Sequence, residues 1–124
     1  MKGEPVVRHI NDIEAIIAGD HCFLKEIFHP GRNPVNTHHS LAYAWIDPQG
    51  KTLDHYLKQS ETYYIVSGKG VMYINHQPVE VCSGSSYYIP PECSQYLVNT
   101  GNEPLCFLVI VDPPWRKEDE FVVE

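Results

Sequence analysis

Short apolar stretches, each ended by glycine, proline, asparagine or serine, recur along most of this chain. Their alternation of apolar and polar side chains and their β-favouring residues are typical of strands. The predicted strands cover residues 21–28, 41–46, 52–57, 62–66, 71–74, 79–82, 87–89, 95–98 and 105–111. Many short strands joined by tight turns predict an all-β barrel or sandwich.

One segment follows a different pattern. Residues 11–19 read Asn-Asp-Ile-Glu-Ala-Ile-Ile-Ala-Gly, in which Asn11 or Asp12 can cap a helix, the isoleucines can form an apolar face, and Gly19 can end it. The sequence therefore predicts a short helix that covers one end of the barrel.

The last residues, 112–124, form a charged segment broken by prolines. It also carries large apolar side chains, at Trp115, Phe121, Val122 and Val123. Apolar groups are costly to leave in water. We therefore expect this tail to pack on the barrel or on a partner subunit.

Length and composition fit one small domain. The chain has 124 residues, of which 43% are hydrophobic, and this is enough for a single core. We expect one domain over residues 1–124, with a barrel core at about 38–111, an N-terminal helix and strand at 11–29, and the tail at 112–124.

The charge balance excludes some partners. Nine Lys and Arg stand against sixteen Asp and Glu, giving a net charge of −7, so a basic face for nucleic acid is not expected. No apolar run approaches the length of a membrane span, and the first residues lack a signal-peptide stretch. We expect a cytoplasmic protein that contacts neither membrane nor nucleic acid.

Two blocks of residues with fixed spacing contain the candidate site residues. The first comprises Gly50, His55, Leu57, Glu61 and Gly68. The second, separated from the first by fifteen residues, comprises Gly84, Pro90, Glu92, Gln95 and Asn99. In a small barrel, neighbouring strands present side chains to one interior point, so both blocks are expected to contribute to one site.

This spacing resembles the two motifs of the cupin superfamily. The first motif reads glycine, five residues, His-x-His, three or four residues, glutamate, six residues, glycine. The second reads glycine, five residues, Pro-x-Gly, two residues, histidine, three residues, asparagine. The match covers about residues 38–111, with four residues in place of five between Gly50 and His55. The resemblance implies a cupin-type double-stranded β-helix, also called a jelly-roll barrel.

The resemblance also implies a metal site at the barrel mouth, with a reduced set of ligands. His55 and Glu61 match two family ligands, whereas Leu57 and Gln95 replace two histidines. Leucine cannot bind a metal, and a glutamine amide oxygen is a weak ligand for transition metals. His55, Glu61 and Gln95 would therefore hold Mn, Fe or Zn weakly or not at all.

Residues of this site also have predicted roles in catalysis and in substrate binding. A carboxylate inside a small barrel is costly unless it has a partner. Glu61 is therefore the predicted catalytic acid or base. The alternative is that Glu61 lies on the rim of the barrel in solvent. Tyr63 points the same way as Glu61 on a strand, and with Gln95 it is a predicted substrate-binding residue. Packing is the alternative for Tyr63.

The predicted function is a small cupin that binds a divalent metal and acts on or binds a small oxygenated molecule. One alternative is a metal-free enzyme similar to sugar isomerases and epimerases, in which His55, Glu61 and Tyr63 move protons. Another is a non-catalytic module that binds or senses a small molecule. The resemblance further implies a homodimer, since single-domain cupins commonly pair through their outer sheets.

Overall fold

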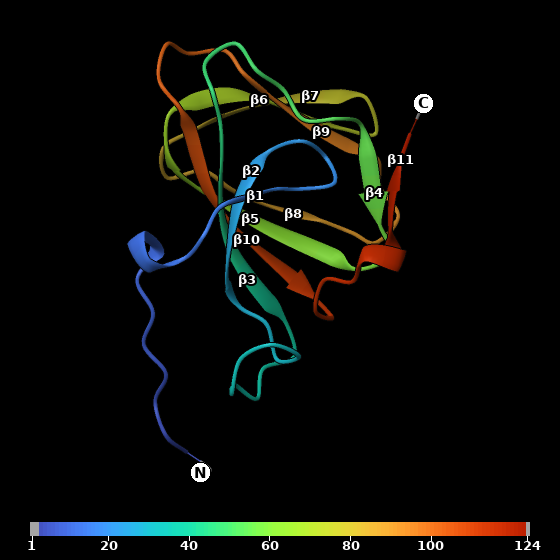
Figure 1. Ribbon diagram of the computed structural model, residues 1–124. Helices are drawn as coiled ribbons and strands as arrows, with labels where there is room; N and C mark the ends of the chain where they lie inside the picture. The colour runs from blue at the N-terminus through green and yellow to red at the C-terminus, as the bar shows by residue number, and fades with distance from the viewer. Residues whose placement is uncertain (1–2, 124) are drawn as a thin grey trace.

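Two antiparallel sheets packed face to face form the barrel, and the computed structural model describes residues 3–123 (Figure 1). One sheet has the order β1-β2-β3-β10-β5-β8, with strands Ile16–Ile17, Phe23–Phe28, Ser40–Ile46, Leu105–Asp112, Ser60–Ser67 and Ser86–Ile89. The other has the order β11-β4-β9-β6-β7, with strands Glu120–Val122, His55–Leu57, Gln95–Asn99, Lys69–Ile74 and Gln77–Cys82. The prediction of an all-β jelly-roll barrel is confirmed.

The two-residue period of the strands decides which side chains line the interior. On β3 every second residue from Ser40 to Ile46 is buried, and on β10 every second residue from Leu105 to Val111. Successive side chains of a strand point to opposite faces of the sheet. The inward side chains pack into one core, which includes Ala44, Ile65, Met72, Ile89, Leu97, Leu105 and Phe107.

Tight turns join the strands as the sequence predicted. Asn75 and His76 connect β6 to β7 with φ of 49° and 68°, the backbone of a two-residue hairpin whose twist matches its strands. Glu92, after the two prolines, also has a positive φ of 65°. Its N–H donates to the carbonyl of Leu57 at 2.7 Å, so this corner is tied to the end of β4.

The helix predicted over residues 11–19 is wrong. The segment contains a 3-10 turn at Ile10–Asp12 and then the short strand β1, in which Ile16 and Ile17 pair with Leu24 and Phe23 of β2. Ile16 and Ile17 are 55% and 67% exposed, so no apolar helical face meets the core. A helix this short is costly to nucleate without tertiary packing, whereas pairing on a sheet edge gives backbone groups hydrogen-bond partners.

The C-terminal segment packs on its own barrel. After β10 it forms a 3-10 turn, Lys117–Asp119, and then β11, which pairs with β4 along one edge of the five-stranded sheet (Figure 1). The ring of Phe121 stacks on Tyr56 with ring centroids 5.1 Å apart. Val122 and Val123 remain exposed, so only part of the predicted packing of the tail is present.

Within residues 3–123, no helix has the length and apolar character needed to cross a bilayer.

Candidate functional site

Strand alternation brings all four predicted site residues to the barrel interior. His55 opens β4, Glu61 and Tyr63 share the inner face of β5, and Gln95 opens β9, where it is the register partner of His55. The four side chains are between 1% and 5% exposed. The solvent-rim alternative for Glu61 does not apply, because this carboxyl group is buried.

Glu61, Gln95 and Tyr63 form one hydrogen-bonded chain. The amide nitrogen of Gln95 donates to Oε1 of Glu61. The hydroxyl of Tyr63 donates to the amide oxygen of Gln95 at 2.9 Å and lies 3.4 Å from Oε2 of Glu61. Gln95 therefore holds the carboxyl group in position, and Tyr63 in turn holds the amide.

His55 faces a second group of residues. Its Nδ1 lies 2.8 Å from the carbonyl oxygen of Leu53, and its Nε2 lies 3.5 Å from Oδ2 of Asp20. One ligand atom each of Asp20, His55 and Glu120 lies within 4.8 Å of the other two. The interior thus contains two adjoining clusters, one around Glu61 and one around His55.

Sequence reasoning missed Asp20 and Glu120. Asp20 precedes β2, and Glu120 opens β11 in the tail, and neither has a place in the two spaced blocks. The only signal was the apolar content of the tail, which indicated that it packs on something. It did not indicate which charged side chain the tail would bring to the barrel.

Tyr87 was also not among the predicted site residues. Its ring stacks on that of Tyr63, with centroids 5.0 Å apart. Its hydroxyl is buried and has no hydrogen-bond partner within the described part of the chain. A buried hydroxyl without a partner is costly, so this group is available to a polar ligand atom.

Burial dominates the acid–base properties of the cluster. It raises the pKa of Glu61 to about 7, although the nearby His55 and the hydrogen bond from Gln95 oppose the change. Burial and the Glu61 charge also raise the pKa of Tyr63 and Tyr87, so both phenols remain proton donors. A carboxyl group that titrates near neutral pH can accept or return a proton.

The pKa of His55 reflects opposing effects. Burial favours the neutral ring and lowers the pKa, but the carboxylates of Asp20 and Glu61 and the Leu53 carbonyl outweigh it, and the pKa is raised. Burial also raises the pKa of Glu120. The charge states of His55, Glu61 and Glu120 therefore depend on one another.

The ligand set implied by the motif does not fit this arrangement well. Both polar atoms of the Gln95 amide are used by Glu61 and Tyr63, and Leu57 is buried in the apolar core. The joint role of His55, Glu61 and Gln95 as metal ligands stays a prediction.

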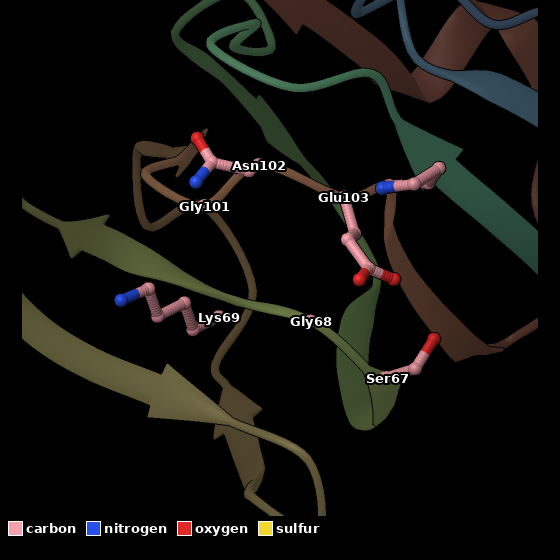
Figure 2. A pocket seen from close by; sticks show the side chains of 7 residues that line it. Ser67, Gly68, Lys69, Gly101, Asn102 and Glu103 are labelled. Atoms are coloured by element: carbon pink, nitrogen blue, oxygen red, sulfur yellow. The ribbon is translucent and has the colours of Figure 1, made fainter.

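Two surface hollows lie outside the interior clusters. One, of about 300 Å³, is lined by residues 67–69 and 101–104 (Figure 2). Ser67 is six residues along β5 from Glu61, which places this hollow about 20 Å from the carboxyl group. Its polar side chains, Lys69, Asn102 and Glu103, point in different directions (Figure 2). A second hollow, of about 340 Å³, is lined by residues 51–54, His76 and Tyr96.

The sequence profile of the cupin domain matches residues 42–111, more than half of the chain. This protein belongs to the cupin family. The match includes His55, Glu61 and Gln95 and excludes Asp20 and Glu120.

Relatives of this cupin include both unassigned and enzymatic proteins. It is 34% identical over 113 residues to an uncharacterized protein of Methanocaldococcus jannaschii, covering 90% of each chain. It is 29% identical over 116 residues to a glucose-6-phosphate isomerase of Thermococcus kodakarensis, covering 89% of this chain. The match spans only 57% of the isomerase.

Solved structures share the fold at low sequence identity. A Streptomyces nucleoside dehydratase matches with a TM-score of 0.79 and 18% identity, covering 98% of this chain and 92% of the dehydratase. The polyketide cyclase RemF from Streptomyces resistomycificus matches with a TM-score of 0.81 and 16% identity, covering 98% and 87% of the two chains. At these identities the likeness extends to the fold alone.

Proposed function

We propose that this cupin is an acid–base enzyme for a small, uncharged oxygenated molecule such as a sugar. Glu61 moves the proton, Gln95 and Tyr63 hold Glu61 in position, and Tyr87 donates a hydrogen bond to the ligand. A divalent metal held at His55 completes the site.

The single observation that carries this proposal is the state of Glu61. Its carboxyl group is 5% exposed, hydrogen-bonded by a neutral amide rather than paired with a cation, and has its pKa raised by burial to about 7. The best general base has a pKa near the working pH. A purely structural carboxylate would be stabilised by a Lys or Arg partner, whereas among residues 3–123 the hydrogen-bond partners of Glu61 are Gln95 and Tyr63.

The proposed step is proton transfer next to a carbonyl group. The Glu61 carboxylate takes the proton of a carbon–hydrogen bond, whose electron pair forms a carbon–carbon double bond while the carbonyl electrons move to oxygen. The Glu61 carboxylic acid then returns the proton to carbon. A bound divalent metal would supply charge stabilisation at that oxygen, and the Tyr87 hydroxyl would donate to an oxygen of the same ligand.

The charges in the interior support an uncharged substrate. The carboxyl groups of Asp20, Glu61 and Glu120 all affect the pKa of His55, and no lysine or arginine is among the groups that do so. A phosphorylated sugar would bring further negative charge into this acidic interior. We therefore propose neutral hydroxycarbonyl compounds rather than their phosphates, although one relative is a glucose-6-phosphate isomerase.

The C-terminal segment is the proposed entrance. Trp115 packs against the core, and its ring N–H donates to Oε1 of Glu120 at 3.1 Å. Because Glu61 and Gln95 are nearly closed off from solvent, a ligand reaches them when a covering segment moves. Movement of residues 113–119, which include Trp115 and end before β11, would open this side of the barrel while Glu120 stays in place.

Hydrogen exchange into substrate tests this function. Purified protein is incubated in D₂O with a panel of neutral aldoses, ketoses and related hydroxycarbonyl compounds, and carbon-bound deuterium is followed by NMR. We expect exchange with at least one compound and loss of more than about 100-fold of the rate in Glu61→Gln. Glu118→Gln, an exposed glutamate that pairs with Arg116, is the matched control and should keep the wild-type rate.

Two other results would replace the proposal. Exchange that persists in fully chelated protein would favour the metal-free isomerase-like alternative. Tight binding of a compound with no exchange or turnover, unchanged by Glu61→Gln, would favour a binding or sensor module.

A further inference from the structure

Three potential metal ligands come from segments far apart in the sequence. Asp20 lies before β2, His55 opens β4, and Glu120 opens β11. Their ligand atoms lie within 4.8 Å of one another. Asp20 and His55 are buried, and Glu120 is half-buried.

The distances suit one ion. Two ligand atoms at about 2.1 Å from a tetrahedral ion are about 3.4 Å apart. The distance between Nε2 of His55 and Oδ2 of Asp20 is 3.5 Å. That distance is longer than a normal N–H···O hydrogen bond, and it matches two ligands of a shared cation.

Each of the three side chains has one polar atom held by the protein. Nδ1 of His55 lies against the Leu53 carbonyl. Oδ1 of Asp20 accepts the N–H of Cys22 at 3.2 Å, and Oε1 of Glu120 accepts the ring N–H of Trp115 at 3.1 Å. Outer partners of this kind orient metal ligands and fix the tautomer of a ligating histidine.

The tautomer of His55 places a lone pair of Nε2 beside the two carboxylates. A carbonyl oxygen can only accept, so Nδ1 must carry a proton, and in the neutral ring Nε2 then has a lone pair. That lone pair faces the carboxylate of Asp20, with Glu120 close by. Two such groups repel unless a positive charge lies between them, and this charge is either a proton or a metal ion.

The local backbone leaves room for this arrangement. A Cβ atom at Gly19 would lie 3.0 Å from Oε1 of Glu120, so the absence of a side chain lets the Glu120 carboxylate approach Asp20. The carboxylates of Asp20, Glu61 and Glu120 give the region an excess of negative charge around one imidazole, which a divalent cation would balance.

We propose that Asp20, His55 and Glu120 form a divalent metal site whose ligands differ from the set implied by the family motif. Two of its three ligands come from segments outside the matched family region, residues 42–111. One imidazole and two carboxylates suit Zn²⁺, Fe²⁺ or Mn²⁺, with Zn²⁺ tighter than Mn²⁺. Three protein ligands leave a position open for water or substrate.

This inference rests on the proposed function for its purpose, because a metal on this set leaves Glu61 free to move a proton. Its test does not require turnover. The site also ties both terminal segments to β4, so bound metal should stabilise the fold.

Metal titration separates the two ligand sets. Untagged protein is stripped with a chelator, and binding of ZnCl₂ and MnCl₂ is measured by calorimetry together with thermal unfolding. We expect one Zn²⁺ per chain and an unfolding temperature that rises with Zn²⁺ concentration. Asp20→Asn and Glu120→Gln should each weaken binding more than about tenfold. Glu118→Gln should bind as the wild type does, and Glu61→Gln should weaken binding much less than either ligand variant, because it removes a nearby charge but no ligand.

The opposite pattern would overturn the site. Binding lost in Glu61→Gln and Gln95→Ala but kept in Asp20→Asn and Glu120→Gln would place the ion on the motif residues. If Zn²⁺ did not bind at stoichiometric concentrations, the site would be excluded. The positive charge between the imidazole and the carboxylates would then be the proton of a protonated His55. Both results differ from failure of the proposed function, in which metal binds and no hydrogen exchange occurs.

Crystals of the wild-type protein soaked in ZnCl₂ give a second measurement if a variant does not fold. We expect an anomalous peak between His55, Asp20 and Glu120. A peak beside Gln95 and Glu61, or none, would contradict the assignment.

Discussion

Glu61 is kept in the barrel at a cost in stability. Its carboxyl group is buried beside Gln95 and Tyr63, and burial raises its pKa from 4.5 to about 7. The folded protein therefore takes up a proton at Glu61 at a pH where the unfolded chain does not. Natural proteins retain such costly groups most often at functional sites.

The pH dependence of stability tests this property. Between about pH 4.5 and 7 the folded state binds more protons at Glu61 than the unfolded state, so stability falls as pH rises through this range and levels off above it. The shift corresponds to a loss on the order of 3 kcal/mol. Glu61→Gln should remove this loss.

Urea unfolding of chelated protein at several pH values is the measurement. Other groups also titrate, so the difference between wild type and Glu61→Gln isolates Glu61. We expect the variant to gain stability relative to the wild type as pH rises from 5 to 8. A constant difference across that range would show that Glu61 is not perturbed in the folded state.

At the scale of elements, the residues of the two motif blocks serve two purposes: some shape the turns between strands, and others line the barrel interior. Gly68, between β5 and β6, has a φ of 93°, and Gly84, between β7 and β8, has a φ of 92°. Asn99 donates to the carbonyls of Ile46 and Glu103 and accepts the N–H of Gly101. These residues hold turns, while His55, Glu61 and Gln95 line the interior.

Glu92 shows how the motif can change without loss of the turn. It stands where the family motif has glycine, and its φ of 65° is in the left-handed region. A non-glycine residue there costs about 1 kcal/mol or more. The hydrogen bond from its N–H to Leu57 helps to hold this backbone in place.

The two motif glycines should differ in their tolerance of alanine. A Cβ at Gly68 would lie 2.8 Å from the Pro104 carbonyl oxygen and 2.9 Å from Cα of Leu105, whereas a Cβ at Gly84 has no other atom within 4 Å. Gly68→Ala should therefore destabilise by about 3 kcal/mol or more, from strain and overpacking together. Gly84→Ala should cost about 1 kcal/mol, from backbone strain alone.

Denaturant unfolding of both variants compares these costs, with circular dichroism to confirm the β fold. If both variants lost the same free energy of unfolding, the atoms around a Cβ at residue 68 would be shown to move apart without cost.

At the scale of the whole molecule, one sheet face is conspicuously apolar. Tyr64, Val66, Tyr88 and Ile110 are exposed on the adjacent strands β5, β8 and β10, and we call them the outer patch. Contiguous apolar surface of this kind marks interaction sites. Because Trp115 and Phe121 pack on their own barrel, the outer patch is the surface expected to support the predicted homodimer.

Sedimentation equilibrium tests the dimer. We expect wild-type protein to be dimeric at micromolar concentration and Ile110→Lys to be mainly monomeric, because a lysine on each copy would be buried without a partner. Val79→Lys, at an exposed position on β7 in the other sheet, is the matched control and should remain dimeric. A monomeric wild type would contradict the prediction.

The positions of most strands could be predicted from the sequence, but one segment could not. The strands from β2 to β10 lie where apolar alternation and turn residues placed them, because both signals are local. The segment at residues 11–19 was predicted wrongly, because Ile13, Ile16 and Ile17 have the spacing of a helix face but the segment is too short to form a helix without packing on the core. Pairing with β2 is a contact between segments, and it outweighed the local pattern.

By itself, the amino-acid sequence determined the barrel, and the spacing of its two motif blocks placed His55, Glu61 and Gln95 inside it. Tyr63 followed from Glu61, because a two-residue period puts both side chains on one face of a strand. Only the tertiary structure decided which groups these residues meet. Asp20 and Glu120 reach His55 from opposite ends of the chain, and contacts between such distant segments depend on how the whole barrel packs, which no spacing within a strand records.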